Sequence, residues 1–167
     1  PPLEDYNLFT SDAALNEALT REGAGWAKAG VTEFGAVLGQ AETIRQGEQA
    51  NRFKPELRVF DRFGQRIDEV EFHPAYHHMM DLCMRHRMPT IAWTAQQQGG
   101  HVAHTAMEYM AFQIEPGVCC PLTMTYAAVP ALRAEPALAA EWEPLILSGI
   151  YDPCLLYTSP SPRDKTV

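Results

Sequence analysis

The pattern of apolar and polar positions predicts a chain of helices interrupted by one pair of strands. Through most of the sequence, apolar residues recur every three or four positions, which is the spacing of an amphipathic helix. Between residues 56 and 72 the period shortens to two. The chain is therefore predicted to be mainly α-helical, with one accessory β-hairpin. We expect helices at 11–23, 26–35, 38–51, 74–88, 90–95, 102–115, 121–132 and 136–142.

The short-period segment has the composition of a hairpin. Leu57 and Val59 alternate with their neighbours, Val70 alternates with two glutamates, and residues 61–64 supply a turn that ends in glycine. A two-stranded hairpin is only marginally stable in water. We therefore expect this one to lie on the helices.

The stretch CCPLTMTYAAVPAL, residues 119–132, is apolar on every side, and such a helix is expected at the centre of a fold. Pro121 suits the first helical position, and about 12 residues span about 18 Å, too short to cross a membrane. Pro130 removes one interior hydrogen bond, so we expect a bend or an early end there. The Thr123 and Thr125 hydroxyls could satisfy the freed backbone groups.

Composition narrows the class of protein further. A chain of 167 residues suits one domain with a sizeable core. The net charge of −8 argues against a polyanionic partner for this segment, because nucleic-acid binding depends on Lys and Arg. The four cysteines (Cys83, Cys119, Cys120, Cys154) form no C-x-x-C motif, which fits reduced thiols in a cytoplasmic protein.

Histidines are the first candidates for chemistry. His73 and His77 are four residues apart and could hold zinc with His78, but the H-E-x-x-H motif is absent. Helix-start and surface histidines are the favoured interpretation. His101 and His104, three residues apart, are expected on a partly exposed helix face. We predict no metal site.

The adjacent thiols and the hairpin carboxylates are weaker candidates for chemistry than the histidines. Cys119 and Cys120 could be a redox pair, but adjacent cysteines form a strained ring, so structural packing is favoured. Asp68, Glu69 and Glu71 could suggest an acid and base pair, but alternation places the two glutamates on one face beside solvent. The arginines of the hairpin lie among these carboxylates, which dilute their field.

Four stretches of the chain, residues 11–26, 38–51, 54–77 and 120–132, resemble the N-terminal domain of AidB-type proteins, the alkylation-response branch of the acyl-CoA dehydrogenase family. The likeness runs from about residue 6 to residue 152 in the same order. It implies an FAD-containing oxidoreductase, acting on CH–CH bonds, of three parts: an N-terminal helical domain, a β domain and a C-terminal helical domain. This chain would be the first part, and its partners the other two.

The resemblance also implies a homotetramer for the longer protein, and DNA contact through its C-terminal domain. An alternative is a non-catalytic, DNA-protecting or protein-interaction helical domain. The family's catalytic carboxylate and main flavin contacts lie beyond this segment, and neither G-x-G-x-x-G nor G-x-x-x-x-G-K-[ST] occurs here. We therefore expect no catalytic residue and an inactive fragment without flavin.

The resemblance places one candidate site on the chain. The family's N-terminal helices wall one side of the flavin and acyl pocket, and the nearest segment is expected at the start of the central apolar helix. The pocket-wall candidates are Leu122, Thr123, Met124, Thr125 and Tyr126. They are not expected to hold FAD by themselves.

The end of the chain departs from the family. From Cys154 the sequence reads CLLYTSPSPRD, which resembles a translated sequencing-library adapter. We therefore expect a domain at residues 1–153 and a non-native, disordered tail at residues 154–167. A natural proline-rich terminus is the alternative.

Overall fold

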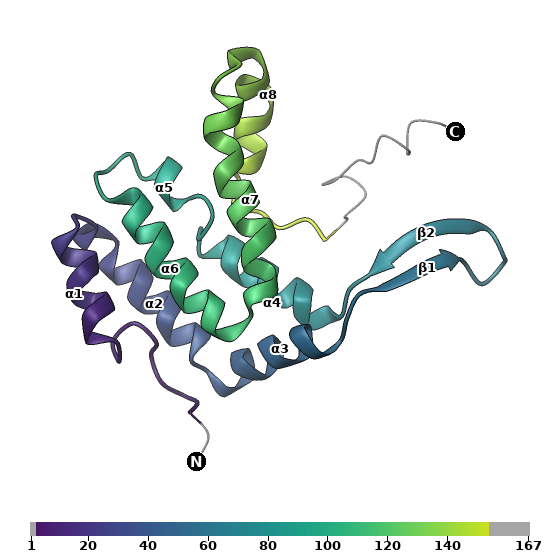
Figure 1. The fold of residues 1–167 in the computed structure, drawn as a ribbon, viewed down its shortest axis with the longest axis horizontal. Coiled ribbons are helices and arrows are strands. Elements are labelled where there is room, and N and C mark those ends of the chain that lie inside the picture. The colour runs from purple at the N-terminus through teal and green to yellow at the C-terminus, as the bar shows by residue number, and fades with distance from the viewer. Residues whose placement is uncertain (1–2, 154–167) are drawn as a thin grey trace.

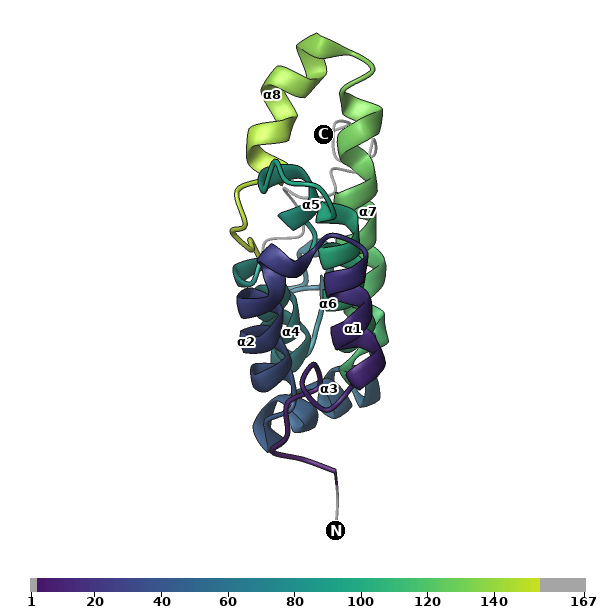
Figure 2. The same ribbon diagram turned by 90° about the vertical axis from the view of Figure 1, so that its left-hand side faces the viewer.

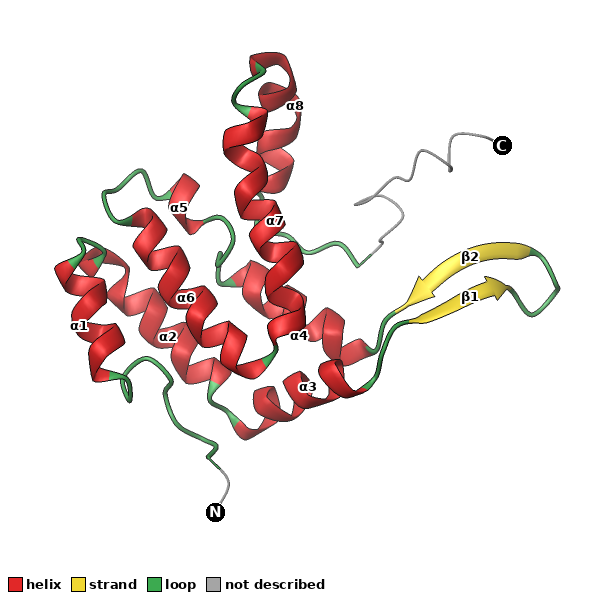
Figure 3. Cartoon of the chain, viewed as in Figure 1, coloured by secondary structure: helices red, strands yellow, loops and turns green. Residues whose placement is uncertain are grey.

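The computed structural model describes residues 3–153 and shows a mainly helical chain with one antiparallel hairpin (Figures 1 and 3), as the sequence predicts. The candidate tail, residues 154–167, lies outside the described residues. The elements are α1 (Ala13–Arg21), η1 (Gly25–Ala27, a 3-10 helix), α2 (Lys28–Leu38), α3 (Ala41–Arg52), β1 (Glu56–Phe60), β2 (Arg66–Glu71), α4 (Pro74–Arg85), α5 (Ile91–Thr94), α6 (Gly100–Ile114), α7 (Pro116–Leu132) and α8 (Pro136–Ile146).

Helix α6 is the centre of the core. It packs against α1, α2, α3, α5 and α7, and two views show α1 and α2 beside it (Figures 1 and 2). Its spacing of small residues and methionines brings neighbouring helices close. The α6 side chains buried in this way are Ala103, His104, Ala106, Met107, Met110 and Ala111.

The apolar stretch predicted to be central is helix α7, and it is not buried on all sides. The helix begins at Pro116 rather than Pro121, because the Glu115 carboxylate caps it by accepting a hydrogen bond from the Val118 N–H at 2.6 Å. Leu122 is buried, but Met124 is 68% exposed. Helices α7 and α8 extend beyond the other helices (Figure 1). An apolar sequence pattern indicates that a helix packs against something, but not whether that partner lies in the same stretch of chain.

Pro130 leaves one backbone carbonyl of α7 without its usual hydrogen-bond donor, and a tryptophan side chain supplies a donor instead. A proline at position 130 has no N–H for the carbonyl of Tyr126, four residues earlier. The Trp93 indole Nε1–H donates to that carbonyl at 3.0 Å, and α7 continues to Leu132. The threonines do not take this role, since the Thr125 hydroxyl donates to the Pro121 carbonyl at 3.0 Å instead.

Helix α8 is also longer than predicted. It continues through Pro144 to Ile146, whereas the proline pattern predicts an end at residue 142. Arg133, just after α7, forms an ion pair with Glu143 of α8. This pair ties the two projecting helices together, although its exposure limits its contribution to stability.

The hairpin has the predicted bounds but not the predicted location. Leu57 pairs with Val70, and the Asp61 carboxylate accepts hydrogen bonds from the N–H groups of Phe63 and Gln65, both at 2.8 Å. The strands extend away from the helices (Figure 1), and Leu57 is 62% exposed. The expectation that the hairpin lies on the helices is therefore wrong.

The N-terminal segment lies along α2. The Leu8 N–H donates to the Gly35 carbonyl at 3.1 Å, and the side chains of Leu8 and Phe9 are buried. Leu3, at the start of this segment, is exposed. The Asp12 carboxylate caps α1 by accepting a hydrogen bond from the Leu15 N–H.

Candidate functional site

Polar and aromatic side chains from α5, α6 and α7 meet where these three helices pack. Residues three or four apart share a helix face, so α6 presents its histidines and a glutamate together, and α7 presents two of the predicted pocket-wall residues. We call the group the α6–α7 cluster. It consists of Trp93, His101, His104, Glu108, Thr123 and Tyr126.

His104 is the buried centre of this cluster. Its Nδ1 lies 2.7 Å from the carbonyl oxygen of Met88, and its ring stacks on that of Tyr126, with centroids 3.9 Å apart and an interplanar angle of 14°. Its Nε2 lies 3.5 Å from Oε2 of Glu108. The residue is only 2% exposed, so its expected place on a partly exposed face is wrong. The histidine instead bonds to the backbone between α4 and α5.

The two pocket-wall residues in the cluster are held by hydrogen bonds to α6. The Thr123 hydroxyl donates to Oε1 of Glu108, and the Tyr126 hydroxyl lies 2.7 Å from Nδ1 of His101. Burial, with a smaller effect of the Glu108 charge, raises the pKa of Tyr126 above its ordinary value. The phenol therefore keeps its proton at neutral pH.

Trp93 closes the cluster from α5. Its ring meets that of His101 edge to face, with centroids 4.9 Å apart, and the Arg133 guanidinium lies 5.3 Å from the tryptophan centroid. Together with the hydrogen bond to the Tyr126 carbonyl, these contacts fix the middle of α7. Proline spacing contained a signal for this role, because Pro130 leaves the Tyr126 carbonyl in need of a donor.

The five pocket-wall candidates do not share one surface. Leu122 packs in the core, Thr123 and Tyr126 join the cluster, and Met124 faces outward. Thr125 donates back to α7. Sequence reasoning missed Trp93 and Glu108, since Pro130 indicates that a donor is needed but not which residue supplies it, and the contact of Glu108 with α7 leaves no mark in local spacing.

An apolar groove of about 390 Å³ lies between α1 and α6, next to the cluster. His101 belongs to both, because it lines the groove and also meets Tyr126. The other lining residues are Leu15, Ala18, Leu19, Val102, Thr105, Ala106 and Tyr109.

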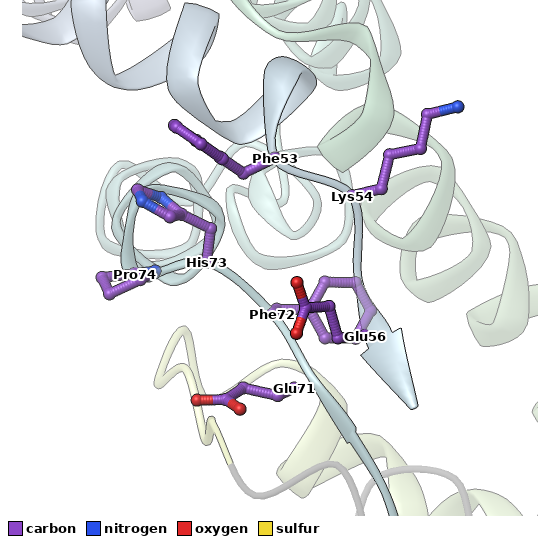
Figure 4. A pocket seen from close by; sticks show the side chains of 7 residues that line it. All are labelled: Phe53, Lys54, Glu56, Glu71, Phe72, His73 and Pro74. Atoms are coloured by element: carbon purple, nitrogen blue, oxygen red, sulfur yellow. The ribbon is translucent and has the colours of Figure 1, made fainter. Parts of the chain in front are cut away.

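A second hollow, of about 220 Å³, lies where the hairpin joins the helices (Figure 4). In it Phe53 stacks on His73, with centroids 4.6 Å apart, and the Lys54 side chain points away. His73 also caps α4 by accepting from the Ala75 N–H, as a helix-start histidine is expected to do. The polar groups here do not converge on one point, so the α6–α7 cluster is the stronger candidate site.

Among residues 3–153, no group of three or more His, Cys, Asp or Glu side chains could hold a metal ion. His77 instead lies 2.7 Å, through Nδ1, from the Tyr151 hydroxyl. Within the same residues no helix is long and apolar enough to span a bilayer.

The adjacent cysteines differ in their surroundings. Cys119 is buried and Cys120 is exposed, so packing describes only the first. Burial raises the pKa of the Cys119 thiol to about 12 and raises that of Cys83 further.

In a Cys154→Ser background, which removes the cysteine outside the described residues, we expect Ellman's reagent to label Cys120 rapidly. Labelling of Cys83 and Cys119 should require denaturant, and equal rates for all three thiols would contradict their burial.

Tyr151 gives the chain a pH-dependent contribution to stability. Burial is the main cause that raises its pKa to about 12, with lesser effects of Tyr76, Asp152 and Asp81. Because the unfolded phenol ionises near pH 10, the folded state holds this proton more tightly. The contribution is complete below about pH 10 and is lost as the pH rises toward 12. Urea midpoints measured from pH 9 to pH 11.5 should fall less steeply in Tyr151→Phe, and parallel curves would count against this burial.

Comparisons with solved structures show that the fold occurs in known proteins. The chain superimposes on Bd2924 in its apo form with a TM-score of 0.78 and 23% identity, covering 90% of this chain and 31% of that one. For Caenorhabditis elegans ACDH-11 in complex with C11-CoA the TM-score is 0.68 and the identity 21%, over 80% and 23% of the chains. The chain thus shares its helical fold with part of each of these two proteins.

Sequence comparison identifies the branch. Residues 1–153 match the family described as the adaptive response protein AidB N-terminal domain, and the chain belongs to that family. It is 43% identical over 157 residues to the putative acyl-CoA dehydrogenase AidB of Escherichia coli (strain K12). The match covers 93% of this chain and 29% of the length of that relative. The resemblance seen in the sequence is confirmed.

Proposed function

We propose that this chain is the N-terminal part of an FAD-dependent, acyl-CoA dehydrogenase-like oxidoreductase acting on CH–CH bonds, of the alkylation-response branch. In this proposal the Leu122–Tyr126 segment forms part of one wall of the flavin and acyl pocket. The observation that carries it is the family match over residues 1–153 together with the polar cluster built on that segment. In the longer protein, FAD would accept the hydride that leaves a C–H bond of the substrate.

The exposed apolar side chains of α6, α7 and α8 support docking onto further domains. Helices that project from the core and carry large apolar groups are expected to be covered in the complete protein. We propose that the β and C-terminal helical domains of a longer chain cover them, in a cytoplasmic homotetramer. The exposed residues concerned are Tyr109, Phe112, Met124, Leu138, Trp142 and Leu145.

We propose that the described residues supply one wall of a flavin site and not a complete site. The α7 N-terminus, a possible place for a phosphate, is already capped by the Glu115 carboxylate, which would repel an anion. The chain alone should therefore bind FAD weakly and catalyse no dehydrogenation. Titration of the chain with FAD should leave the flavin fluorescence that of the free cofactor. A stoichiometric yellow complex would refute this expectation.

The DNA-protecting alternative has a specific observation against it for this segment. Two hairpin arginines are already paired, since Arg58 Nε lies 2.7 Å from Glu71 and Arg66 Nε lies 2.7 Å from Asp68. With a net charge of −8, the chain should not retard duplex DNA in a gel at low salt. Retardation that weakens steeply with added salt would favour DNA binding by this domain. Any DNA contact of the longer protein is proposed for its C-terminal domain.

We also propose that the domain ends at residue 153. Removal of residues 154–167 should leave the urea midpoint unchanged, because the tail does not belong to the matched family segment. A lower midpoint would show instead that the tail packs on the domain.

A further inference from the structure

The indole of Trp93 carries the donor that helix α7 lacks. Pro130 has no N–H for the Tyr126 carbonyl, and the Trp93 Nε1–H donates to that carbonyl at 3.0 Å. An indole has one N–H donor and no acceptor, so this bond uses its whole hydrogen-bonding capacity. Leaving a partly buried carbonyl without a donor costs free energy, so the bond matters to this part of α7.

The bond is particular to this proline. Within residues 3–153, Pro121 and Pro144 also lie inside helices. In that part of the chain, the carbonyls four residues before those two prolines receive no hydrogen bond from a side chain, whereas the carbonyl left by Pro130 does. Trp93 therefore marks the one interior proline that directly follows the pocket-wall segment.

Tyr126 is also held through its side chain. Its hydroxyl lies 2.7 Å from Nδ1 of His101, and its ring stacks on that of His104. The Trp93 ring lies beside it, with centroids 5.4 Å apart. Because Trp93 fixes the backbone and α6 fixes the phenol, Tyr126 is held in one orientation.

We propose that Trp93 is a positioning residue for the pocket-wall segment Leu122–Tyr126: its indole N–H takes the place of the donor that Pro130 lacks and so fixes Tyr126 against α6. This role rests on the proposed function of the segment as a wall of the flavin and acyl pocket. Trp93 belongs to α5, which packs on α6. The bond thus ties the wall to a helix outside it, and Trp93 acts through Tyr126 without touching a ligand.

A double-mutant cycle in the 167-residue chain tests whether one donor replaces the other. Pro130→Ala gives the Tyr126 carbonyl a donor within α7, so the indole N–H is no longer needed. Trp93→Phe should raise the unfolding equilibrium constant about tenfold more in the wild type than in Pro130→Ala. Pro144→Ala, the same change inside α8, should leave the effect of Trp93→Phe as it is in the wild type.

Hydrogen exchange of the indole proton in the unsubstituted chain is a second measurement, and it needs no variant to fold. The Trp93 indole proton should exchange at least about tenfold more slowly than that of Trp142, whose residue is 43% exposed. Equal exchange rates would overturn the proposal. Equal effects of Trp93→Phe with and without Pro130 would also overturn it, because a loss of ring packing alone costs the same in both backgrounds.

Failure of the proposed function would appear separately. In a longer protein that carries this domain and FAD, Trp93→Phe should shift the visible absorption of the flavin, and adding Pro130→Ala should reverse the shift. The expected coupling in the chain alone, together with an unchanged flavin spectrum in the longer protein, would support the donor role of Trp93 and refute the assignment of this segment to the flavin wall.

Discussion

Replacing Gly39 with alanine is expected to destabilise the chain severely. Gly39 follows α2, and a Cβ at this position would lie 1.6 Å from the carbonyl oxygen of Tyr6. Backbone atoms must move to relieve such a clash, and the Tyr6 N–H bond to the Gly39 carbonyl would be lost with them. We expect a loss of about 3 kcal/mol in the free energy of unfolding, measured by urea denaturation.

Gly30→Ala is the matched control on the same helix. Apart from the adjacent backbone of α2, no atom lies within 4 Å of a Cβ at Gly30, so alanine should stabilise α2 by about 0.5–1 kcal/mol through its helix propensity. The two substitutions are chemically identical and are expected to have opposite signs. Equal effects would contradict the close contact of the N-terminal segment with the end of α2.

The second large effect is expected at Phe34. Its side chain on α2 is fully buried, and its ring centroid lies 5.1 Å from that of His86. Phe34→Ala removes this apolar area and leaves a cavity, at a cost of about 3–5 kcal/mol in the free energy of unfolding. Phe63→Ala, at the tip of the hairpin, is the control, because Phe63 is 72% exposed. It should change stability by less than about 0.5 kcal/mol, and a comparable loss there would show that the hairpin is packed.

The sequence predicts most of the helices because the residues that start and end each helix lie close together in the chain. The helix of Pro74 begins where proline and its preceding histidine place it, and the turn at Asp61 forms through hydrogen bonds within five residues. Pro116, Pro121 and Pro144 show the limit of this reasoning. Pro116 begins α7, whereas Pro121 lies inside α7 and Pro144 lies inside α8. Only the surrounding contacts decide whether such a proline begins a helix or lies within one.

The candidate site could be predicted only in part. The family resemblance pointed to Leu122–Tyr126, but the partners of this segment come from α5 and α6, up to 33 residues away along the chain. The three-residue spacing of His101 and His104 places both on one partly exposed helix face, and nothing in the sequence of α6 indicates the Met88 carbonyl that His104 contacts. Long-range pairing of this kind depends on how the helices pack, which residue spacing does not encode.

The exposed surface of α7 and α8 is the other feature that the sequence pattern does not predict. An apolar helix was expected at the centre of the chain, and it lies at an edge instead. Our explanation is that its second face belongs against domains of the longer protein. This explanation joins the fold to the proposed function, and it makes the exposed Met124 a decisive residue.

The most direct test replaces the matching segment of the Escherichia coli relative with residues 1–153 and measures FAD per chain after purification. We predict that the chimera contains FAD, that Met124→Arg abolishes this FAD content, and that Leu3→Arg, a control of similar exposure at 74% against 68%, does not. Equal FAD content in both variants would contradict the claim that this face of α7 packs against the flavin-binding domains of the longer protein.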